Sequence, residues 1–549
     1  MNFSSHKFWK PGTEGPSVRV REERVTNEQE SEVAVYNSNT SLSIDQQRQR
    51  LPVFAHRTRI LYLVETYQTL VVVGETGCGK STQIPQYLLE AGWAAEGHMI
   101  GVTQPRRVAT VTVATRVAEE RGSLLGDEVG YTIRFDNCSD ANATRIKFMT
   151  DGMMIREIMA DPLLKKYSVI MLDEAHERTI HTDIVIGLLR KIQKKRTDLR
   201  LIVASATLDA EEVRDFFNTD ESGFDTAVIL TVEGRAYPVD IHFAIDPVPD
   251  YLKATVETVM KIHHTEKQGD ILAFLTGQEE VQRTVSLLIE EAKKLSKNQQ
   301  KMKVLPMYAG LPVFEQMKVF QRTPHNTRKI VVSTNIAEAS ITINGIVYIV
   351  DAGFVKLKAY NAKTGIESLI VVPVSQASAK QRAGRAGRVR AGKAYRLYTE
   401  NAYKMLDAAA VPEIRRSELS PLILQLKALG ISNILRFHYL SPPPAENMVR
   451  GLELLFALGA LDDNGNLTSP LGLQMAEFPL SPMFAKMLLV SGDFQCSEEA
   501  VIVSAMTQIQ NVFISPSGQR SGADRARRNF SVKEGDHITL INVFKSFIK

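Results

Sequence analysis

The sequence predicts an α/β protein with two tandem parallel-sheet domains, followed by a mainly helical region. Short Val- and Ile-rich strands alternate with helical stretches from about residue 51 to 230, as in TLVVVG, HMIGVTQ, RIKFMT, SVIMLDE and LRLIVASAT. This rhythm is typical of a parallel sheet covered by helices on both faces. The pattern restarts with DILAFLTG, KVLPMYAG, KIVVSTN, GIVYIVD and AYRLYT. After about residue 400 the strands largely disappear, and segments such as LSPLILQLKALG carry apolar residues at helical spacing.

Composition bounds the possible function classes. The chain has 549 residues, 44% of them hydrophobic and 23% charged, so most of it is expected to fold around ordinary cores. Residues 1–50 are rich in Ser, Asn, Gln, Glu and Arg, and we expect a mostly disordered tail there. The net charge of +4 is too small to prove a nucleic-acid partner, so any such contact must come from local arginines.

Cysteine spacing and hydropathy exclude other classes. The three cysteines form no CxxC or other ligand spacing, which argues against zinc sites and a disulfide framework. No apolar stretch approaches the ~18 residues that a membrane span needs, and the start MNFSSHKFWKPG does not resemble a signal peptide. We therefore expect a soluble intracellular protein with no membrane partner.

A phosphate-binding loop is indicated between the strand TLVVVG and the helical stretch STQIPQYLLEAG. Residues 74–82 read GETGCGKST and satisfy G-x-x-x-x-G-K-[ST], although an ordinary glycine turn is the alternative. Glycines let the backbone wind around phosphates, so that N–H groups and a helix N-terminus face them. Lys80 would reach the β- and γ-phosphates, and the Ser81 hydroxyl is a ligand for Mg²⁺. The predicted nucleotide-binding residues of the loop are Gly74, Glu75, Thr76, Gly77, Cys78, Gly79, Lys80, Ser81 and Thr82.

An acidic pair follows another predicted strand, in SVIMLDEAHE. Asp173 is placed to hold Mg²⁺, and Glu174 is placed to polarise the attacking water and is also a candidate metal ligand. Taken alone, such a pair would be a solvated helix start. Together with the phosphate loop it predicts an NTP hydrolase that uses ATP and Mg²⁺.

A third motif lies in the second α/β domain. Residues 381–388 read QRAGRAGR, with Arg382, Arg385 and Arg388 at three-residue spacing. Such a run is often a solvated basic helix face. Here the arginines could reach across a cleft to the γ-phosphate, where an arginine finger is worth on the order of 10³–10⁵ in rate.

In this order and spacing, GETGCGKST, TQPRRVA, DEAHER, SAT, STNIAEAS and QRAGRAGR resemble the DEAH-box RNA helicases of superfamily 2. The resemblance runs from about residue 50 to the end. It implies RecA-like domains over 51–231 and 232–400, a winged helix over 401–467 and part of a helical ratchet domain over 468–549. It also implies an RNA-stimulated NTPase that moves 3′ to 5′ on single-stranded RNA and remodels RNA–protein complexes in pre-mRNA splicing, in the nucleus.

The resemblance assigns roles to further residues. The implied catalytic set is Glu174, His176, Gln381, Arg385 and Arg388. His176 would contact Gln381 across the cleft, and Ser205 and Thr207 of SAT would couple the nucleotide state to RNA binding. The family sandwiches the base between an arginine and a phenylalanine, which match Arg116 and Phe320. Since stacking does not read the edge of a base, we expect ATP, GTP, CTP and UTP all to be accepted.

The RNA path is expected along the ends of predicted strands. TQPRR, YTIRF, TDGM and STNIAEAS all lie there, where side chains and backbone can hold phosphates and sugars without reading sequence. The expected contacts are Arg106, Arg107, Arg134, Thr150, Thr334, Asn335 and Ser340. Ala339 stands where the family usually has threonine, a change expected to tune coupling. Residues 354–372 fit a β-hairpin that the family is proposed to use in separating strands.

Two rivals to an RNA motor remain at this stage: an RNA- or protein-binding scaffold without turnover, and a DNA-directed motor. Spliceosomal and activator proteins are expected partners, and a monomer is expected. Family members continue past the ratchet domain into an OB-fold, whereas this sequence ends at Lys549. We therefore expect basal hydrolysis with weak RNA stimulation, and exposed apolar surface at VFISP and LINVF.

Overall fold

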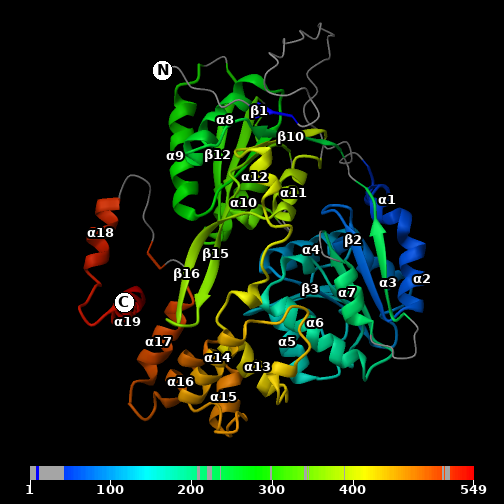
Figure 1. The fold of residues 1–549 in the computed structure, drawn as a ribbon, viewed down its shortest axis with the longest axis vertical. Coiled ribbons are helices and arrows are strands. Elements are labelled where there is room, and N and C mark those ends of the chain that lie inside the picture. The colour runs from blue at the N-terminus through cyan, green and yellow to red at the C-terminus, as the bar shows by residue number, and fades with distance from the viewer. Residues whose placement is uncertain are drawn as a thin grey trace. The chain divides into compact units, whose positions relative to one another are not determined.

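The computed structural model describes residues 8–10, 42–206, 210–218, 225–234, 237–296, 299–324, 326–338, 343, 345–388, 390–509, 512–513 and 520–549. These separate into two compact units. The first contains residues 1–359, 368–416 and 439–441, and the second contains residues 360–367, 417–438 and 442–549. Figure 1 shows the elements of both units. None of the helices among these residues has the length and apolar character needed to cross a bilayer.

The first domain is built on an eight-stranded sheet in the order β5-β4-β6-β3-β7-β8-β2-β9. All neighbours are parallel except the edge pair β4 and β5. In chain order its strands are β2 (Thr69–Gly74), β3 (Met99–Gln104), β4 (Val129–Ile133), β5 (Asp136–Cys138), β6 (Ile146–Thr150), β7 (Tyr167–Leu172), β8 (Arg200–Ser205) and β9 (Ala227–Val232). The inner strands are buried on both faces, because helices cover the sheet on each side.

The helices of this domain follow the strands as α/β connections. They are α1 (Ile44–Gln49), α2 (Arg57–Thr66), α3 (Lys80–Glu90), α4 (Arg107–Arg121), α5 (Asp151–Ala160), α6 (Ile180–Gln193) and α7 (Ala210–Phe217), with short 3-10 turns η1 (Pro52–His56) and η2 (Ala175–Glu177). The six predicted motifs of this domain lie at the ends of β2, β3, β4, β6, β7 and β8, at the carboxyl edge of the sheet. Ligands bind outside this edge in open α/β sheets.

The second domain has a seven-stranded sheet in the order β1-β10-β17-β14-β11-β13-β12. Its strands are β1 (Phe8–Trp9), β10 (Val239–Ala244), β11 (Asp270–Phe274), β12 (Lys301–Met307), β13 (Thr327–Ser333), β14 (Ile346–Asp351) and β17 (Gly392–Arg396). Its helices and 3-10 turns are α8 (Tyr251–Thr265), α9 (Gln278–Lys293), α10 (Val313–Met317), η3 (Lys318–Phe320), η4 (Asn335–Ala337), α11 (Gln376–Gly384), α12 (Glu400–Lys404) and η5 (Glu413–Arg415). β15 (Phe354–Asn361) and β16 (Ile366–Pro373) form the expected hairpin.

The expectation of a disordered tail over residues 1–50 is wrong at two places. β1 pairs antiparallel with β10, and the Phe8 ring lies 5.1 Å from that of Tyr395. α1 begins with a capping box, in which Ser43 and Gln46 satisfy each other's backbone N–H groups. A tail of polar composition can still order where a few residues find partners on a folded domain. Residues 1–7 and 11–41 lie outside the described part.

The second unit is helical, as predicted. Its helices are α13 (Ser420–Ala428), α14 (Ala445–Ala457), α15 (Leu471–Glu477), α16 (Pro482–Val490), α17 (Ser497–Thr507), α18 (Arg520–Arg528) and α19 (Asp536–Ile548), with the 3-10 turn η6 (Ile434–Arg436). The expected exposure of LINVF is wrong, because Ile541 is 5% exposed and packs with the buried side chains of α17. VFISP is described only at Val512 and Phe513. Val512 packs against the same cluster, and Phe513 is partly buried.

The expected start of a separate winged helix at residue 401 also differs from the compact division, which falls at 416/417. The reason is hydrogen bonding to the first α/β domain. Glu413 N donates to the Arg178 carbonyl at 3.1 Å, and Ile180 N donates to the Glu413 carboxylate at 3.2 Å. These bonds attach the segment around Glu413 to the first α/β domain.

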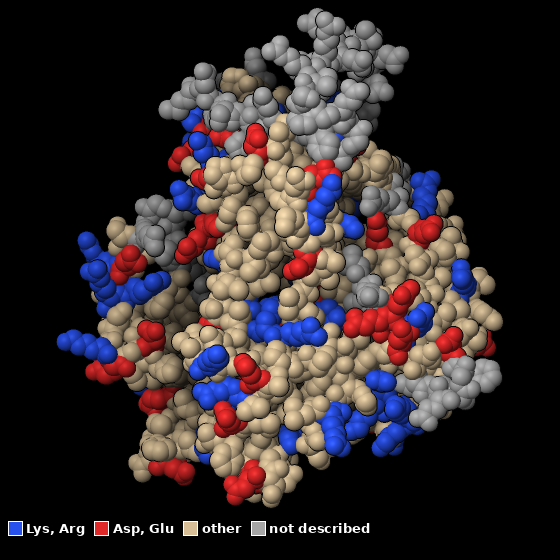
Figure 2. Space-filling model, viewed as in Figure 1, with Lys and Arg blue, Asp and Glu red and all other residues tan. Residues whose placement is uncertain are grey.

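Charge is distributed as the small net value predicts. Figure 2 shows acidic and basic side chains interspersed over one face, with several Lys and Arg gathered near its centre. Local clusters of arginine, rather than the overall charge, must therefore carry any attraction for a polyanion.

Candidate active site

The phosphate loop follows β2 and leads directly into α3. Gly77 and Gly79 have φ of 91° and 99°, in the left-handed region that favours glycine. At Gly79 a Cβ would also come within 2.9 Å of Val53 Cγ1. Both glycines are therefore needed for this winding of the backbone at the N-terminus of α3, which favours a phosphate cradle over an ordinary turn.

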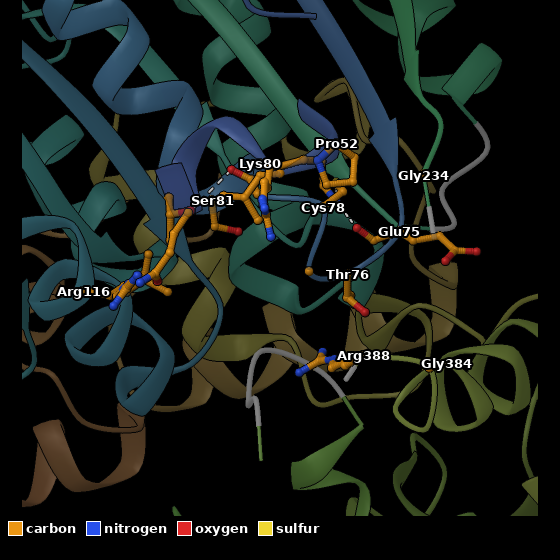
Figure 3. Close-up of a pocket in the computed structure, with 18 of the residues that line it drawn as sticks. Pro52, Glu75, Thr76, Cys78, Lys80, Ser81, Arg116, Gly234, Gly384 and Arg388 are labelled. Atoms are coloured by element: carbon orange, nitrogen blue, oxygen red, sulfur yellow. Dashed lines mark hydrogen bonds between the residues drawn. The ribbon is translucent and has the colours of Figure 1, made fainter. Parts of the chain in front are cut away.

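Lys80 is held over the loop by the backbone of the loop itself. Lys80 is only 6% exposed, and its Nζ donates to the carbonyls of Gly74 at 2.5 Å and Glu75 at 3.0 Å. Nζ also lies 3.6 Å from Cys78 Sγ. Figure 3 shows Lys80, Ser81 and Cys78 together at this loop. The ammonium is thus fixed beside the backbone N–H groups, where phosphate oxygens would meet both.

The acidic pair lies beside the loop, immediately after β7. Asp173 is 1% exposed and accepts from Gln104 Nε2 at 2.5 Å and from the Glu174 N–H at 2.9 Å. It also forms a side-chain hydrogen bond with Ser81. Burial, and then the neighbouring Glu174 carboxylate, raise the pKa of Asp173. The site therefore bears a buried carboxylate that a cation would stabilise.

This donor set fits Mg²⁺. The ion prefers hard oxygen ligands and is usually bound through one or two carboxylates together with water and substrate phosphates. Ser81 and Asp173 supply a hydroxyl and a carboxylate in contact with each other. No group of three or more His, Cys, Asp and Glu forms a metal cluster in the part of the chain that the structure describes. Ser81 and Asp173 would therefore hold the ion, with phosphate oxygens completing its shell.

Glu174 is set apart from Asp173 by its backbone. Its φ is 52°, which is uncommon for a residue with a side chain, and it lines the same cavity as the phosphate loop. Sparsely populated backbone conformations of this kind cluster at functional sites. The conformation lets adjacent carboxylates serve two positions, Asp173 beside Ser81 and Glu174 facing the cavity.

The predicted contact of His176 with Gln381 is absent from the hydrogen bonds of the described residues. His176 Nδ1 instead accepts from the N–H of Ala206, the middle residue of SAT, at 3.3 Å. Burial lowers the pKa of His176 to about 4, so the ring is neutral at pH 7. Its Nε2 lies 3.4 Å from the Glu174 carboxylate, but a neutral ring makes no ion pair there. The DEAH turn is therefore linked to SAT within its own domain.

The three arginines of the second domain separate into two roles. Arg385 and Arg388 line the cavity with Glu174, whose charge acts on both guanidinium groups. Figure 3 shows Arg388 across the cavity from Lys80, on the far side of Thr76. Arg382 points instead into its own domain, where Nε donates to Glu338 at 2.9 Å and Nη1 donates to Asp351 at 2.7 Å. Only the last two arginines are placed for phosphate chemistry.

The cavity has a volume of about 670 Å³, within the range of ligand pockets. Both α/β domains line it, and every predicted residue of the phosphate loop except Gly74 belongs to the lining. Arg116 lines it as well, whereas Phe320 does not. Phe320 packs against the buried cluster of the second domain because it lies on the short turn η3 over that core. Of the predicted pair, Arg116 alone therefore lines the cavity, and its stacking on a base stays a prediction.

The expected RNA contacts divide in a similar way. Arg106, an expected RNA contact, also bonds within the protein: its Nε donates to Glu177 at 3.0 Å, and its guanidinium donates to the Ile336 carbonyl of the second domain at 3.2 Å. It therefore joins the two domains. Arg107 is exposed. The pKa of Arg134 is lowered first by burial and then by the positive charges of Arg107 and of Arg156 on α5, so the three arginines lie close together.

For the other predicted positions the structure gives their places at the ends of strands and helices, or the positions lie outside the described residues. Thr150 is the N-cap of α5 at the end of β6. Thr334 and Asn335 follow β13, where Thr334 N donates to the Met307 carbonyl at 3.1 Å. Ser205 is fully buried at the end of β8. Thr207, Ala339 and Ser340 lie outside the described residues.

Sequence reasoning missed three groups at this site. Gln104 orients Asp173, Glu120 binds Arg116, and residues 47–52 form a wall of the cavity. Gln104 could have been found, because it ends a predicted strand beside the DEAH strand. Glu120 lies four residues after Arg116 on the same helix, a spacing that could have been recognised from the sequence. The role of residues 47–52 depends on packing between distant segments, for which a single sequence carries no signal.

Two parallel-sheet domains with a phosphate loop, an acidic pair and two arginines on one cavity define the class of two-domain nucleotide-driven motors. Residues 54–216 match the family described as DEAD/DEAH box helicase, and residues 254–390 match the helicase conserved C-terminal domain. Residues 451–480 and 481–540 match the winged-helix and ratchet-like parts of the helicase associated domain. The chain belongs to the DEAH-box family of ATP-dependent RNA helicases.

Individual relatives agree with this placement. The human protein named probable ATP-dependent RNA helicase DHX35 is 66% identical over 99% of this chain and 78% of its own length. A DHX35 homolog of Caenorhabditis elegans is 59% identical over 95% of this chain and 71% of its own length. The pre-mRNA-splicing factor ATP-dependent RNA helicase prp22 of Schizosaccharomyces pombe is 50% identical over 93% of this chain and 43% of its own length.

Proposed function

We propose that this helicase couples NTP hydrolysis to 3′-to-5′ movement along single-stranded RNA, and that it remodels RNA–protein complexes in pre-mRNA splicing. The observation that carries the proposal is the shared cavity. The phosphate loop, Ser81, Asp173 and Glu174 come from one domain, whereas Arg385 and Arg388 come from the other. A ligand in this cavity must therefore act on the arrangement of both domains, which is what stepping requires.

The chemistry follows from the side chains around the cavity. Lys80 and the loop N–H groups would bind the β- and γ-phosphates, and Ser81 and Asp173 would hold Mg²⁺, which neutralises phosphate charge when bound. Glu174 would orient the attacking water and accept its proton. Arg385 and Arg388 would stabilise the charge that develops on the transferred group. Arg116 would stack on the base.

RNA would be held through its phosphate and sugar backbone. The like-charged Arg107, Arg134 and Arg156 gather at the carboxyl edge of the first sheet, and such clusters attract phosphates without reading sequence. Thr150, Thr334, Asn335 and Ser340 extend this set, and Ser205 and Thr207 would couple it to the nucleotide. The hairpin β15–β16 would separate strands.

The splicing role rests on the name of the S. pombe relative, and with it we propose a nuclear location and spliceosomal and activator proteins as partners. We also propose a monomer with RecA-like domains over 51–231 and 232–400, a winged helix over 401–467 and a partial ratchet domain over 468–549, in which residues 401–416 pack with the RecA-like domains.

The test is NTP hydrolysis by the whole chain, measured without nucleic acid, with single-stranded RNA and with single-stranded DNA of the same sequence at matched salt. The proposal predicts stimulation by RNA beyond that by DNA. Equal stimulation would favour a DNA-tolerant motor, and no hydrolysis under any condition would favour a scaffold.

A further inference from the structure

A continuous chain of hydrogen bonds joins the N-terminal helix α1 to Arg116. Arg48 Nε donates to Gln83 Oε1 at 2.8 Å, and Gln83 Nε2 donates to Glu120 Oε2 at 2.7 Å. The other oxygen of Glu120 accepts from Arg116 Nε at 2.8 Å. Gln86 adds a second amide donor to Glu120, at 2.8 Å. Four side chains from α1, α3 and α4 therefore converge on the residue expected to stack on the base.

The middle members of this series of hydrogen bonds are buried, whereas its last member, Arg116, is partly exposed. Gln83 and Gln86 are fully buried, and the Glu120 side chain is 4% exposed, whereas that of Arg116 is 43% exposed and lines the cavity. A charge-assisted hydrogen bond to a buried carboxylate is stronger and better directed than a solvated one. Arg116 is thus held by Glu120 at its Nε, while the rest of its guanidinium is exposed to the cavity, the arrangement that stacking on a ring needs.

Arg48 influences which end of the Gln83 side-chain amide faces Glu120. An amide side chain has a distinct donor end and acceptor end. Because Arg48 occupies the oxygen of Gln83, the nitrogen of that amide must face Glu120. Removing Arg48 would leave the Gln83 amide held only through its nitrogen, which donates to Thr82 Oγ1 at 3.0 Å and to Glu120, so the donor that fixes the Glu120 carboxylate would be less firmly oriented.

The segment that follows α1 is built into the same site. Val53 N donates to the Cys78 carbonyl of the phosphate loop at 3.0 Å. Leu51 and Val53 fill the space beside Gly79. Gln47, Arg50 and Pro52 line the cavity with the loop, and Figure 3 shows Pro52 next to Lys80. The position of α1 is therefore set by direct contact with the nucleotide site.

We propose that Glu120 and Arg48 are positioning residues of the nucleotide site, which fix Arg116 for stacking on the base, and that α1 is consequently part of the base-binding wall. This rests on the proposed nucleotide binding but not on hydrolysis. Both residues line the cavity, and the proposal assigns them to the orientation of Arg116 through Gln83 and Glu120 rather than to the phosphates. Their removal should therefore weaken the binding of ligands that carry a base and spare those that do not.

The experiment compares ADP with pyrophosphate, each with Mg²⁺, as ligands of the whole chain by calorimetry or by displacement of ADP. Glu120→Gln should raise the dissociation constant of ADP about fivefold, the effect of one side-chain hydrogen bond. Arg48→Ala should raise it about twofold, because it acts one bond further away. The dissociation constant of pyrophosphate should stay unchanged in both variants.

Two matched controls are available. Glu119→Gln removes an exposed carboxylate 3.9 Å from the Arg116 guanidinium, on the same helix. Arg57→Ala removes a cation that shares Glu90 with Arg48 and makes no bond to Gln83. Both controls should bind ADP as the parent does.

Three results would overturn the proposal: unchanged ADP binding in Glu120→Gln, an equal loss of ADP and pyrophosphate binding, or the same loss in Glu119→Gln. If Glu120→Gln does not fold, Arg48→Ala carries the same test from the more exposed end. Because binding is measured at equilibrium, a parent that binds ADP without hydrolysing ATP would contradict the proposed function and leave this inference testable.

Discussion

Replacing Arg382 with alanine should destabilise the second domain without removing a group from the nucleotide cavity. Arg382 is fully buried and forms hydrogen-bonded ion pairs with Glu338 and Asp351, at 2.9 and 2.7 Å. Alanine would leave Asp351, itself 1% exposed, as a buried charge supported by the Tyr398 hydroxyl and the Gly353 N–H, each at 3.0 Å. Breaking one side of a buried ion pair costs about 3–5 kcal/mol. For a domain of this size that corresponds to roughly 6–20 °C in Tm.

The assay is calorimetry on the whole chain, with hydrogen exchange to assign the loss to β14 and α11. Lys380→Ala is the control, because Lys380 is exposed on the same helix and should change stability by less than ~0.5 kcal/mol. ATP hydrolysis by Arg382→Ala, measured well below its Tm, should remain. An unchanged Tm together with lost hydrolysis would refute this reasoning and place Arg382 with Arg385 and Arg388.

Three further outcomes are expected. Lys80→Ala should abolish hydrolysis and greatly weaken nucleotide binding, measured by calorimetry, whereas Glu174→Gln should bind Mg-ATP and turn over very slowly; turnover near that of the parent would exclude Glu174 as the proton acceptor. Hydrolysis of GTP, CTP and UTP should lie within about tenfold of ATP, or ~1.4 kcal/mol, and a thousandfold preference for ATP would reveal a contact to the base edge. The folded pKa of His176, about 4, lies below the ordinary value of 6.5, so the unfolded chain takes up the proton first as the pH falls. Stability from His176 should therefore be complete above pH 6.5 and fall by about 2 kcal/mol between pH 7 and pH 5; His176→Gln should lack this part of the slope in urea unfolding, and an identical slope would contradict the neutral ring.

The motifs of the first domain could be placed from sequence because each one lies at the end of a strand, whereas QRAGRAGR begins on helix α11. Local spacing fixes Lys80 and Ser81 at the start of a helix, and the parallel sheet brings Asp173 to the same edge. The strands β1, β5, β9 and β10 were not predicted. β1 and β5 have only two and three residues, too few to show a pattern, whereas β9 carries the apolar run AVILTV.

Contacts between distant side chains were beyond prediction. The link from Arg48 to Gln83 spans 35 residues of sequence, and its donor lies in a polar segment with the composition of a tail. Which neighbour a side chain finds was equally hidden: His176 binds the SAT backbone and Phe320 packs on the core. Composition describes what a segment can bury, but not which surface it meets.

The central claim is that hydrolysis in the shared cavity drives movement on RNA. The most direct measurement is strand displacement from RNA duplexes that carry a 3′ or a 5′ single-stranded overhang, with ATP, by the parent chain and by Glu174→Gln. We predict displacement by the parent on the 3′ overhang alone, and none by Glu174→Gln although it binds ATP. Displacement that is equal on both overhangs, or that persists in Glu174→Gln, would contradict the claim.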